Sequence, residues 1–550
     1  MASRKNILQR ISQLFHTVKY LKPIQIYYRL KYRWTTPFDG GGVHDLSTRQ
    51  KGGRVTFLSK ANSFDAEKGF TFLNQTVQFS TAADWNQITN DKLWLYNLHY
   101  FDFLNSRDND RWFKEYGEII KNWINVHSAI EGDGWESYPT SLRIVNWVKY
   151  FIRQDSVNNA FHESLVRQAR FLSRRCEYHL LGNHLFANAK ALIFVGFYFE
   201  GDEARKWLEK GMTIVNSEIK EQVLADGGNF ELSPMYHNIF LEDVLDIINL
   251  LQLYDRHVSP LFIVQAKKML RWMSKMTHPD GLISFFNDAA INIASTAAEL
   301  TRYSEELSIR QEDRTEHHLT HLKESGYIVI SCKDIHAILD VADVGPDYLP
   351  GHAHADTLSF ELSLYGKRVF VNSGTSVYGA DDERLRQRGS AAHNTLVIDG
   401  ENSSEVWGGF RVARRARIKD ITIQRIGDEK LISASHTGYL RLSGRPVHNR
   451  KWKFLNNELI IEDQVFSKEQ HEVIILYHIH PDWHVQSVGK QIEISFEQHK
   501  VIMAFSKMGD LSIENSSYHP EFGVSVQNKK IKLSWRGECP VKFVTKITWS

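Results

Sequence analysis

The sequence predicts a chain in two parts, a helical array followed by a large antiparallel β-sheet system. Between about residues 85 and 307 the apolar residues recur at intervals of three and four, a spacing typical of helices. After about Tyr327 the period changes to two, which is typical of strands. The 550 residues, of which 42% are hydrophobic and 24% charged, are enough for two or more domains that each bury a core.

The helical half contains five long segments with this apolar spacing, at 111–127, 141–154, 163–181, 186–201 and 238–254. Three stretches between predicted helices resemble one another, at 131–141, 225–237 and 278–288, and each contains an Asp-Gly pair followed by aromatic and polar residues. Asp-Gly permits a tight turn, so we expect equivalent rim loops of stacked helical hairpins. Loops of this kind collect functional side chains.

The strand half contains segments of alternating polarity separated by turn signals. The turns are Tyr365-Gly366, Asp399-Gly400 and Asn456-Asn457. The segments are 326–331, 336–343, 357–364, 367–374, 394–400, 451–465, 472–480, 491–506 and 530–537. They predict an antiparallel sandwich. We expect an N-terminal arm at 1–80, a helical domain at 81–315 and a sheet domain at 316–550, with a polar hinge at 308–325.

The first 38 residues form a basic arm that also carries Ile, Leu and aromatic residues. Eight Lys and Arg occur there and no Asp or Glu precedes Asp39, although the whole chain has a net charge of only +2. The overall charge gives no case for nucleic acid. The arm is either a helix packed on the body of the protein or a peripheral contact with an anionic membrane surface.

The expected location is the cytoplasm or the periphery of the inner membrane. The N-terminal sequence does not match a secretory signal, and no apolar run approaches the roughly 18 residues of a membrane span. The three cysteines, Cys176, Cys332 and Cys539, are odd in number and far apart. This pattern fits a reducing compartment better than a disulfide framework.

Two candidate sites lie in the helical half. In LLGNHLFANAK, Asn183 and His184 precede a helix, and the ordinary alternative is that Asn183 only caps that helix. In ELSPMYHNIF, Pro234 restricts a loop in which Tyr236 and His237 stand just before a helix. The ordinary alternative for Tyr236 is packing.

Two further candidates lie in the strand half. His352, His354 and Asp356 share parity, and on an extended strand they would point to one place. The alternative is that these histidines are buried and simply hydrogen-bonded. In RQRGSAAHNTLVIDG, Arg386, Arg388 and His393 directly precede a strand.

Imidazoles of His354 and His393 together with a carboxylate would suit zinc or a similar divalent ion. Asp356 is the obvious local carboxylate. No Gly-rich nucleotide loop, Cys-x-x-Cys pair or Gly-x-Ser-x-Gly elbow occurs, so phosphoryl transfer and serine hydrolysis lose support.

Four stretches together resemble the heparinase II/III family of polysaccharide lyases and related alginate lyases. They are LLGNHLFANAKAL, DGGNFELSPMYHNIFLEDVL, GHAHADTLSFELSLYGKRVFVNSGTSVYG and RGSAAHNTLVIDG. The resemblance implies an (α/α) toroid followed by an antiparallel β-sandwich. It also implies cleavage of a uronic-acid polysaccharide by β-elimination, in which the C5 proton is removed and the bond to O4 breaks.

The resemblance assigns roles to particular residues. Asn183 and His184 would hold the substrate carboxylate, whose charge must be neutralised before the neighbouring proton can leave. Tyr236 would be the acid for the departing oxygen, and also the base when proton and leaving group lie on the same side. His352 would be the base for the opposite stereochemistry. The expected substrate contacts are Arg388, through both oxygens of the carboxylate, Tyr378 and the rim-loop residue Trp135.

The resemblance also implies a metal site at His354 and His393, whose third ligand in the family is commonly an aspartate. Here Asn372 stands at that position, in Val371-Asn372-Ser373-Gly374. An amide can coordinate through its carbonyl oxygen but brings no charge. Either Asp356 compensates, the ion is held loosely, or the site is an uncharged hydrogen-bonded cluster.

The leading hypothesis is therefore a lyase for an acidic polysaccharide, such as a capsule or O-antigen chain or its precursor near the inner membrane. A non-catalytic glycan-binding protein is one alternative, although binding alone would not need Asn183, Tyr236 and His352 together. A toroid glycoside hydrolase is the other, with its paired carboxylates drawn from the rim-loop residues Glu136, Glu231 and Asp288.

Overall fold

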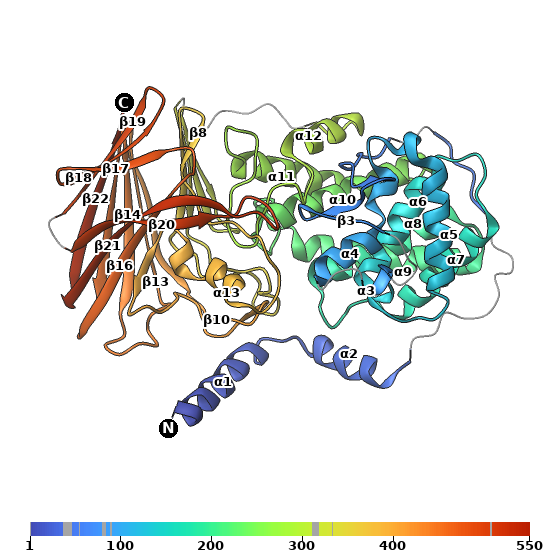
Figure 1. Cartoon of the computed structure of the whole chain (residues 1–550), viewed down its shortest axis with the longest axis horizontal. Coiled ribbons are helices and arrows are strands. Elements are labelled where there is room, and N and C mark those ends of the chain that lie inside the picture. The colour runs from blue at the N-terminus through green and yellow to red at the C-terminus, as the bar shows by residue number, and fades with distance from the viewer. Residues whose placement is uncertain are drawn as a thin grey trace.

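The structure is a computed structural model that describes residues 2–36, 47–53, 56–79, 84–87, 91–310, 318–332, 334–506 and 509–550. It has a helical domain beside a β-sandwich, with two N-terminal helices running along one side of both (Figure 1). These are α1 (Ala2–Val18) and α2 (Pro23–Trp34). A small sheet follows, made of β1 (Phe64–Asp65), β2 (Gly69–Phe72) and β3 (Gln75–Val77). No described helix is both long and apolar enough to cross a bilayer.

The helical domain consists of inner helices that pack against one another and outer helices that cover them. The inner ones are α4 (Lys92–Tyr100), α6 (Ser137–Ile152), α8 (Gly182–Tyr198) and α10 (Pro234–Leu253). Along this series α6 packs against α4 and α8, and α8 packs against α10. The others are α3 (Asp84–Gln87), η1 (Asp102–Asn105), η2 (Asn109–Trp112), α5 (Phe113–Val126), η3 (Asp133–Trp135), α7 (Asn159–Arg174), α9 (Asp202–Gln222), α11 (Pro260–Met276) and α12 (Ala297–Glu306).

Burial explains which helices lie inside. Every residue of α8 from Leu185 to Tyr198 is buried, whereas α5 buries only Tyr116, Ile120 and Trp123. A helix that is apolar on all sides must be surrounded, and one with a single apolar stripe can face water. This alternation of inner and outer helices makes an (α/α) toroid, and α8 and α10 are among its inner helices.

One predicted helix is shorter than expected. The segment 163–181 was expected to be helical throughout, but α7 ends at Arg174. The Asn188 side chain instead accepts a hydrogen bond from the backbone N–H of Glu177 at 2.6 Å. Leu181 and Gly182 then take positive φ angles of 69° and 57°, which turns the chain into α8. A side chain from the next helix therefore ends the expected one.

The second and third rim loops are equivalent, as the internal resemblance predicted, but the first, 131–141, differs because its Asp133-Gly134 pair lies in the short helix η3. In the second, Leu224 N–H donates to Gly228 at 2.9 Å and Val223 bridges to Asn229. In the third, His278 N–H donates to Leu282 at 2.9 Å and Thr277 bridges to Ile283 in the same way. The turn glycines Gly227 and Gly281 both have positive φ, which an Asp-Gly turn allows.

The second domain is an antiparallel sandwich of a nine-stranded and an eight-stranded sheet. The first has the order β20-β21-β16-β8-β7-β6-β5-β4, with β9 also pairing with β16, and the second the order β12-β13-β14-β15-β22-β19-β18-β17. One apolar core lies between them, and Tyr477 of the first donates to Thr545 of the second at 2.9 Å. Both predicted domain types are therefore present.

The strand bounds complete the description. The first sheet contains β4 (Leu319–Leu322), β5 (Tyr327–Cys332), β6 (Ile335–Asp340), β7 (Phe360–Leu364), β8 (Lys367–Phe370), β9 (Leu396–Ile398), β16 (Gln470–Ile479), β20 (Asp510–Tyr518) and β21 (Val526–Glu538). The second contains β12 (Ile418–Ile426), β13 (Glu429–His436), β14 (Val447–Leu455), β15 (Glu458–Phe466), β17 (His484–Val488), β18 (Gln491–Phe496), β19 (His499–Phe505) and β22 (Val541–Trp549). Shorter elements are α13 (Asp382–Arg388), η4 (Ser390–Ala392), and the ribbon of β10 (Val406–Trp407) and β11 (Arg411–Val412).

Two of the predicted turns fall at their expected places. Tyr365-Gly366 joins β7 to β8 with φ angles of 53° and 78°, and Asn456-Asn457 joins β14 to β15. The predicted segments did not include β12, β13, β17, β20 or β22. Of these, β12 is an edge strand that leaves most of its side chains exposed and so lacks an alternating pattern. The last toroid helix, α12, ends at Glu306, and β4 begins at Leu319 inside the predicted hinge, of which residues 311–317 lie outside the described part of the chain.

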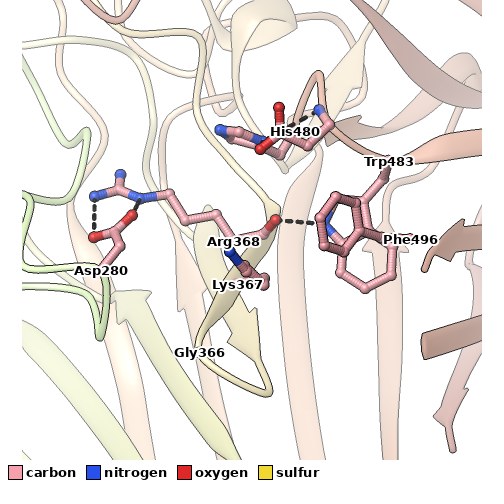
Figure 2. A pocket seen from close by; sticks show the side chains of 8 residues that line it. Asp280, Gly366, Lys367, Arg368, His480, Trp483 and Phe496 are labelled. Atoms are coloured by element: carbon pink, nitrogen blue, oxygen red, sulfur yellow. Dashed lines mark hydrogen bonds and ion pairs between the residues drawn. The ribbon is translucent and has the colours of Figure 1, made fainter. Parts of the chain in front are cut away.

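The two domains are joined through the third rim loop, 278–288. Buried His278 lies 2.8 Å from the Ser363 hydroxyl and 2.9 Å from the Glu361 carboxylate of β7. Arg368 of β8 binds Asp280 at 2.7 and 3.2 Å beside a pocket of about 220 Å³, which is also lined by Trp483 and Phe496 (Figure 2). This pocket contains none of the predicted site residues, and its ion pair ties the rim loop to the sheet.

Candidate active site

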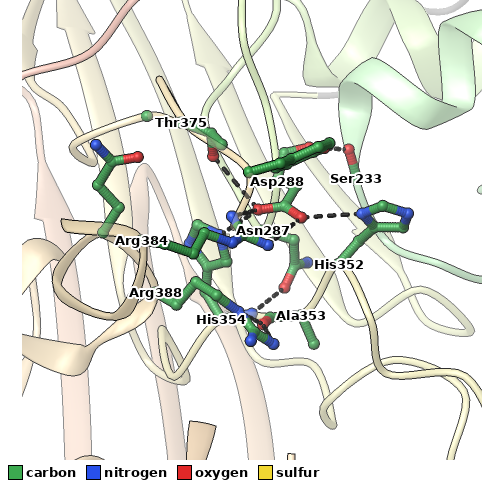
Figure 3. A network of polar contacts seen from close by, with 12 residues as sticks. Ser233, Asn287, Asp288, His352, Ala353, His354, Thr375, Arg384 and Arg388 are labelled. Carbon is green, nitrogen blue, oxygen red and sulfur yellow. Dashed lines mark hydrogen bonds and ion pairs between the residues drawn. The ribbon is translucent and has the colours of Figure 1, made fainter. Parts of the chain in front are cut away.

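Asp288, the last residue of the third rim loop, lies at the centre of a buried polar network (Figure 3). Its carboxylate is 2.9 Å from His352 Nδ1 and 2.8 Å from His354 Nε2. Arg384 of α13 donates to both oxygens, at 2.7 Å to Oδ2. Although burial would raise the pKa of Asp288, Arg384 and then the two histidines hold it well below its usual range. Asp288 is therefore an ionised acceptor for all three partners.

The two histidines lie in an irregular segment, which corrects the prediction of a strand. Residues 343–359 form turns and loops, and β7 begins only at Phe360. Leu358 has a φ of 63°, in the left-handed region, so the segment is not extended and shared parity does not aim the side chains here. His352 and His354 lie close together because each binds a different oxygen of the Asp288 carboxylate.

Asp356 is separated from this pair, so the predicted trio is divided. Its Oδ2 accepts a hydrogen bond from the backbone N–H of Asn287 at 3.2 Å. Burial raises the pKa of Asp356, and burial together with the nearby Asp356 raises that of Asp340 well above its usual range. These two acids form a buried carboxyl pair of their own.

The Tyr236 ring packs against His352, and its hydroxyl contacts Tyr378. The ring centroids of Tyr236 and His352 lie 3.9 Å apart, and the hydroxyls of Tyr236 and Tyr378 lie 3.0 Å apart. Tyr236 stands in the first turn of α10, which begins with Pro234 after the capping residue Ser233. Burial, and then Tyr378 and Asp288, raise the pKa of Tyr236 well above its usual range. Its hydroxyl therefore holds its proton and suits an acid.

Asn183 lies in the first turn of α8, after the cap residue Leu181, so it is not the cap of that helix. Its backbone N–H donates to Glu231 Oε1 at 3.3 Å, and its side-chain amide has no hydrogen bond within the described residues. The other Glu231 oxygen lies 3.6 Å from His352 Nε2. Glu231 thus links the segment of Asn183 to the histidine.

His184 is oriented by a buried carboxylate. Its Nδ1 lies 3.1 Å from Glu177 Oε1, and its ring packs on Tyr138 with centroids 4.4 Å apart. Although burial would lower the pKa of His184, Glu177 raises it. Protonated His184 would present a positive charge one residue from the free amide of Asn183, where an anionic group of a ligand can bind.

Two predicted substrate contacts lie elsewhere. The Arg388 guanidinium is completely buried and donates to the backbone carbonyls of Ala353, Gly408 and Gly409 at 2.8 to 3.1 Å. It supports the loop before His354 and has no free face for a carboxylate. Trp135 is buried at the first rim loop, packed against Phe171 with ring centroids 5.3 Å apart. The structure therefore gives Arg388 and Trp135 structural roles in place of the predicted contacts with substrate.

Two of the three predicted metal ligands lie close together, but the set fits an ion poorly. His354 Nδ1 lies 3.3 Å from His393 Nε2, about the separation of two nitrogens on one tetrahedral ion. Asn372 is fully buried, and its Nδ2 has no hydrogen-bond partner among the described residues. The set brings no carboxylate, because Asp288 binds the other nitrogen of His354 and Asp356 points to Asn287. No described group of three His, Cys, Asp or Glu could hold an ion.

Three residues of the network had little or no signal in the sequence. Arg384 lies one helical turn before Arg388 on α13, which was not among the predicted helices. Asp288 and Glu231 appeared only as carboxylates for the hydrolase alternative. The ionised and fully enclosed Asp288 cannot serve as a proton donor of that mechanism. The equivalence of the rim loops was the signal that could have placed both acids at one site.

Known proteins resemble this chain in sequence and in fold. A family model described as heparinase II/III N-terminus matches residues 26–313, and one described as heparinase II/III-like, C-terminal matches residues 314–550. The heparin-sulfate lyase of Pedobacter heparinus is 27% identical over 428 residues, covering 69% of this chain and 63% of the relative. The heparin-sulfate lyase of Bacteroides stercoris is 26% identical over 321 residues, covering 54% and 46%. The chain thus spans about half to two thirds of these relatives.

Solved structures agree on the architecture. The crystal structure of heparinase III superposes with a TM-score of 0.69 at 18% identity, covering 87% of this chain and 79% of that one. The heparan sulfate lyase HepC from Pedobacter heparinus gives a TM-score of 0.58 at 16% identity, covering 86% and 79%. Toroid and sandwich occur in the predicted order, and the resemblance read from the four motifs is confirmed. The family models cover both domains, and the chain belongs to the heparinase II/III family.

Proposed function

We propose that the protein is a polysaccharide lyase that cleaves a uronic-acid-containing polysaccharide by β-elimination. The observation that carries the proposal is the meeting of Tyr236 and His352, whose ring centroids lie 3.9 Å apart, with Glu231 linking His352 to the segment of Asn183 and His184. An acid, a base and a group that neutralises a carboxylate are what this reaction needs. The curated relatives are heparin-sulfate lyases, which supports an acidic glycan as substrate.

In this proposal the Asn183 amide and the protonated His184 bind the uronate carboxylate and stabilise the charge that grows on it as the C5 proton leaves. The electron pair of the C–H bond forms the C4–C5 double bond, and the C4–O4 bond breaks. The Tyr236 hydroxyl donates its proton to the leaving oxygen. The products are an unsaturated uronate end and a new free hydroxyl.

Either of two groups removes the C5 proton, depending on the stereochemistry of the sugar. When proton and leaving oxygen lie on opposite sides, His352 Nε2 accepts the proton, because Nδ1 donates to ionised Asp288. When both lie on the same side, Tyr236 would have to give up its proton first. Its raised pKa makes that route the slower one unless bound substrate changes its surroundings.

The proposed location is the cytoplasm or the inner membrane, with a capsule or O-antigen chain or its lipid-linked precursor as substrate. The three widely spaced cysteines support a reducing compartment. A peripheral membrane contact through the basic N-terminal arm is part of this proposal. No metal takes part in the proposed steps.

The test is the ultraviolet absorbance of the conjugated double bond during incubation with a panel of uronic-acid polymers and lipid-linked precursors. We expect absorbance to rise in proportion to the new reducing ends. Chains that shorten without this absorbance would show hydrolysis, and bound chains that do not shorten would show a binding protein.

A further inference from the structure

The two N-terminal helices present their apolar side chains to solvent. These side chains are from 39% exposed at Ile24 to 82% exposed at Trp34. They are Leu8, Ile11, Leu14, Phe15 and Val18 on α1 and Ile24, Ile26, Tyr27, Leu30 and Trp34 on α2. Ten such residues on two adjoining helices exceed the scattered exposure of an ordinary surface.

The side of α1 that faces the protein is polar, and the side of α2 that faces it carries Gln25 together with Tyr28 and Tyr32, whose rings lie against Tyr178 and His179. On α1, Ser12 accepts from Arg414 at 2.9 Å and Thr17 accepts from the Trp407 indole at 3.1 Å. On α2, Gln25 is almost fully buried. The apolar faces are thus turned outward by specific polar contacts.

The same helices carry positive charge and no negative charge. The exposed cations are Arg10, Lys19, Arg29, Lys31 and Arg33. No Asp or Glu occurs before Asp39. Apolar side chains flanked by Lys and Arg are the pattern of helices that lie in the interface of an anionic bilayer.

From these observations we propose that α1 and α2 form a docking surface for an anionic lipid bilayer. The apolar side chains enter the headgroup region and the Lys and Arg side chains bind lipid phosphates. A second copy of the chain fits this surface less well, because it would bring another acid-free basic face against the first. Charge complementarity therefore favours lipid.

The docking surface lies close to the segments that carry the proposed catalytic groups. The Gln25 amide donates to the carbonyls of Leu180 and Tyr348, each at 3.3 Å. Leu180 precedes Asn183 by three residues, and Tyr348 precedes His352 by four. Meanwhile α1 contacts β11 of the sandwich, so the arm spans both domains (Figure 1). A bilayer bound by the arm would hold the active site near the membrane surface, which matters for function only if the proposed lyase activity is correct.

The experiment is flotation of the full chain with vesicles of phosphatidylcholine alone or with phosphatidylglycerol added. We expect binding only to the anionic vesicles, weakened by salt. The triple variant Arg29→Glu, Lys31→Glu, Arg33→Glu should lose at least about 100-fold in affinity, since each cation contributes about fivefold. The triple variant Ile11→Ser, Phe15→Ser, Leu30→Ser should lose at least about 10-fold.

Two controls keep the outcome decisive. Val264→Ser and Ile421→Ser remove exposed apolar side chains outside the arm and should bind like the wild type. Turnover of a soluble polymer should be unchanged in the arm variants, so failure of docking and failure of the lyase proposal are told apart. Absence of binding, equal binding to neutral vesicles, unchanged binding by both triple variants, or dimers formed through the arm would each overturn the proposal.

Discussion

Asp288 Oδ2 accepts a hydrogen bond from His352 Nδ1 at 2.9 Å, across the junction of the two domains. Because Arg384 keeps Asp288 ionised, the proton of this bond belongs to the imidazole, and in the neutral ring Nε2 is the nitrogen without a proton. The toroid thus sets the tautomer of a base that the sandwich domain carries. Neither domain has this arrangement alone.

Asp288→Asn should lower both stability and turnover. An amide cannot accept from His352, His354 and Arg384 together, and the buried guanidinium loses its counter-charge. We expect a loss of about 3–5 kcal/mol in the free energy of unfolding and a turnover at least about 100-fold lower. Urea unfolding measures the loss of stability, and the absorbance assay measures the loss of turnover.

Asp399→Asn is the control, because Asp399 also binds a histidine, His471 at 2.7 Å, but is partly exposed and remote from the site. Full turnover by Asp288→Asn would disprove the role of Asp288 in orienting the base.

Tyr236→Phe should abolish turnover and leave glycan binding and folding nearly intact. The change removes one hydroxyl and keeps the ring that packs against His352. Loss of the acid should cost about 100- to 10,000-fold in turnover. Tyr378→Phe is the matched comparison, because it removes the partner hydroxyl at 3.0 Å but not the acid, and its loss should be smaller. If Tyr236→Phe keeps full activity, Tyr236 is not the acid.

The fold was predictable because burial repeats along the sequence, at three to four residues in 111–127 and at two on either side of the turn in 451–465. The site was only partly predictable. Tyr236 and His352 stand in motifs that carry the family resemblance, but Arg384 and Arg388, one helical turn apart, have different roles. Arg384 neutralises Asp288, and Arg388 donates to the carbonyls of Ala353 and Gly408. Which guanidinium meets which acceptor depends on contacts between segments 20 to 96 residues apart, and no local pattern encodes them.

Glu218→Gln should make the protein more stable at high pH. Burial raises the pKa of Glu218 to about 7, above its ordinary value of 4.5. The folded state therefore holds the proton more tightly than the unfolded state, and the stability from this group falls as pH rises from about 4.5 to 7. The variant should match the wild type near pH 4 and exceed it by about 3 kcal/mol near pH 8.

Urea unfolding at the two pH values checks this prediction. The Gln222 amide, which donates to Glu218 at 2.8 Å, keeps an acceptor in the variant. Glu209→Gln, on the exposed face of the same helix, serves as the control and should show no pH-dependent gain. A Glu218→Gln variant whose stability tracks the wild type at both pH values would mean that the buried carboxyl titrates normally.

Asn372→Asp should create a divalent metal site if residue 372 faces the His354–His393 pair. The added carboxylate would supply the charge that the present donor set lacks, and zinc affinity should rise at least about 10-fold. Without metal the variant should be less stable than the wild type, because it buries an unpaired charge at a fully enclosed position. Equilibrium dialysis with metal analysis measures the first effect and thermal unfolding with and without zinc the second. Unchanged metal content would place residue 372 outside any such site.

Glu231→Gln tests whether Glu231 acts on His352 through its charge or by positioning the segment of Asn183. Glu231 Oε1 accepts from the Asn183 backbone at 3.3 Å, and Oε2, which has no hydrogen bond among the described residues, lies 3.6 Å from His352 Nε2. Glutamine keeps the first contact and removes the negative charge that would stabilise the imidazolium formed when His352 takes the C5 proton. We expect turnover to fall about 10-fold on sugars whose proton and leaving oxygen lie on opposite sides, where His352 is the base. KM should stay near its wild-type value because Asn183 is still held.

Glu231→Ala also removes the contact to Asn183, so it should raise KM as well as lower turnover, on sugars of either stereochemistry. Steady-state kinetics on two epimeric uronate polymers distinguishes the cases. Equal losses on both polymers for Glu231→Gln would mean that the carboxyl acts by holding the loop, since a charge next to His352 can affect only the reaction in which His352 becomes protonated.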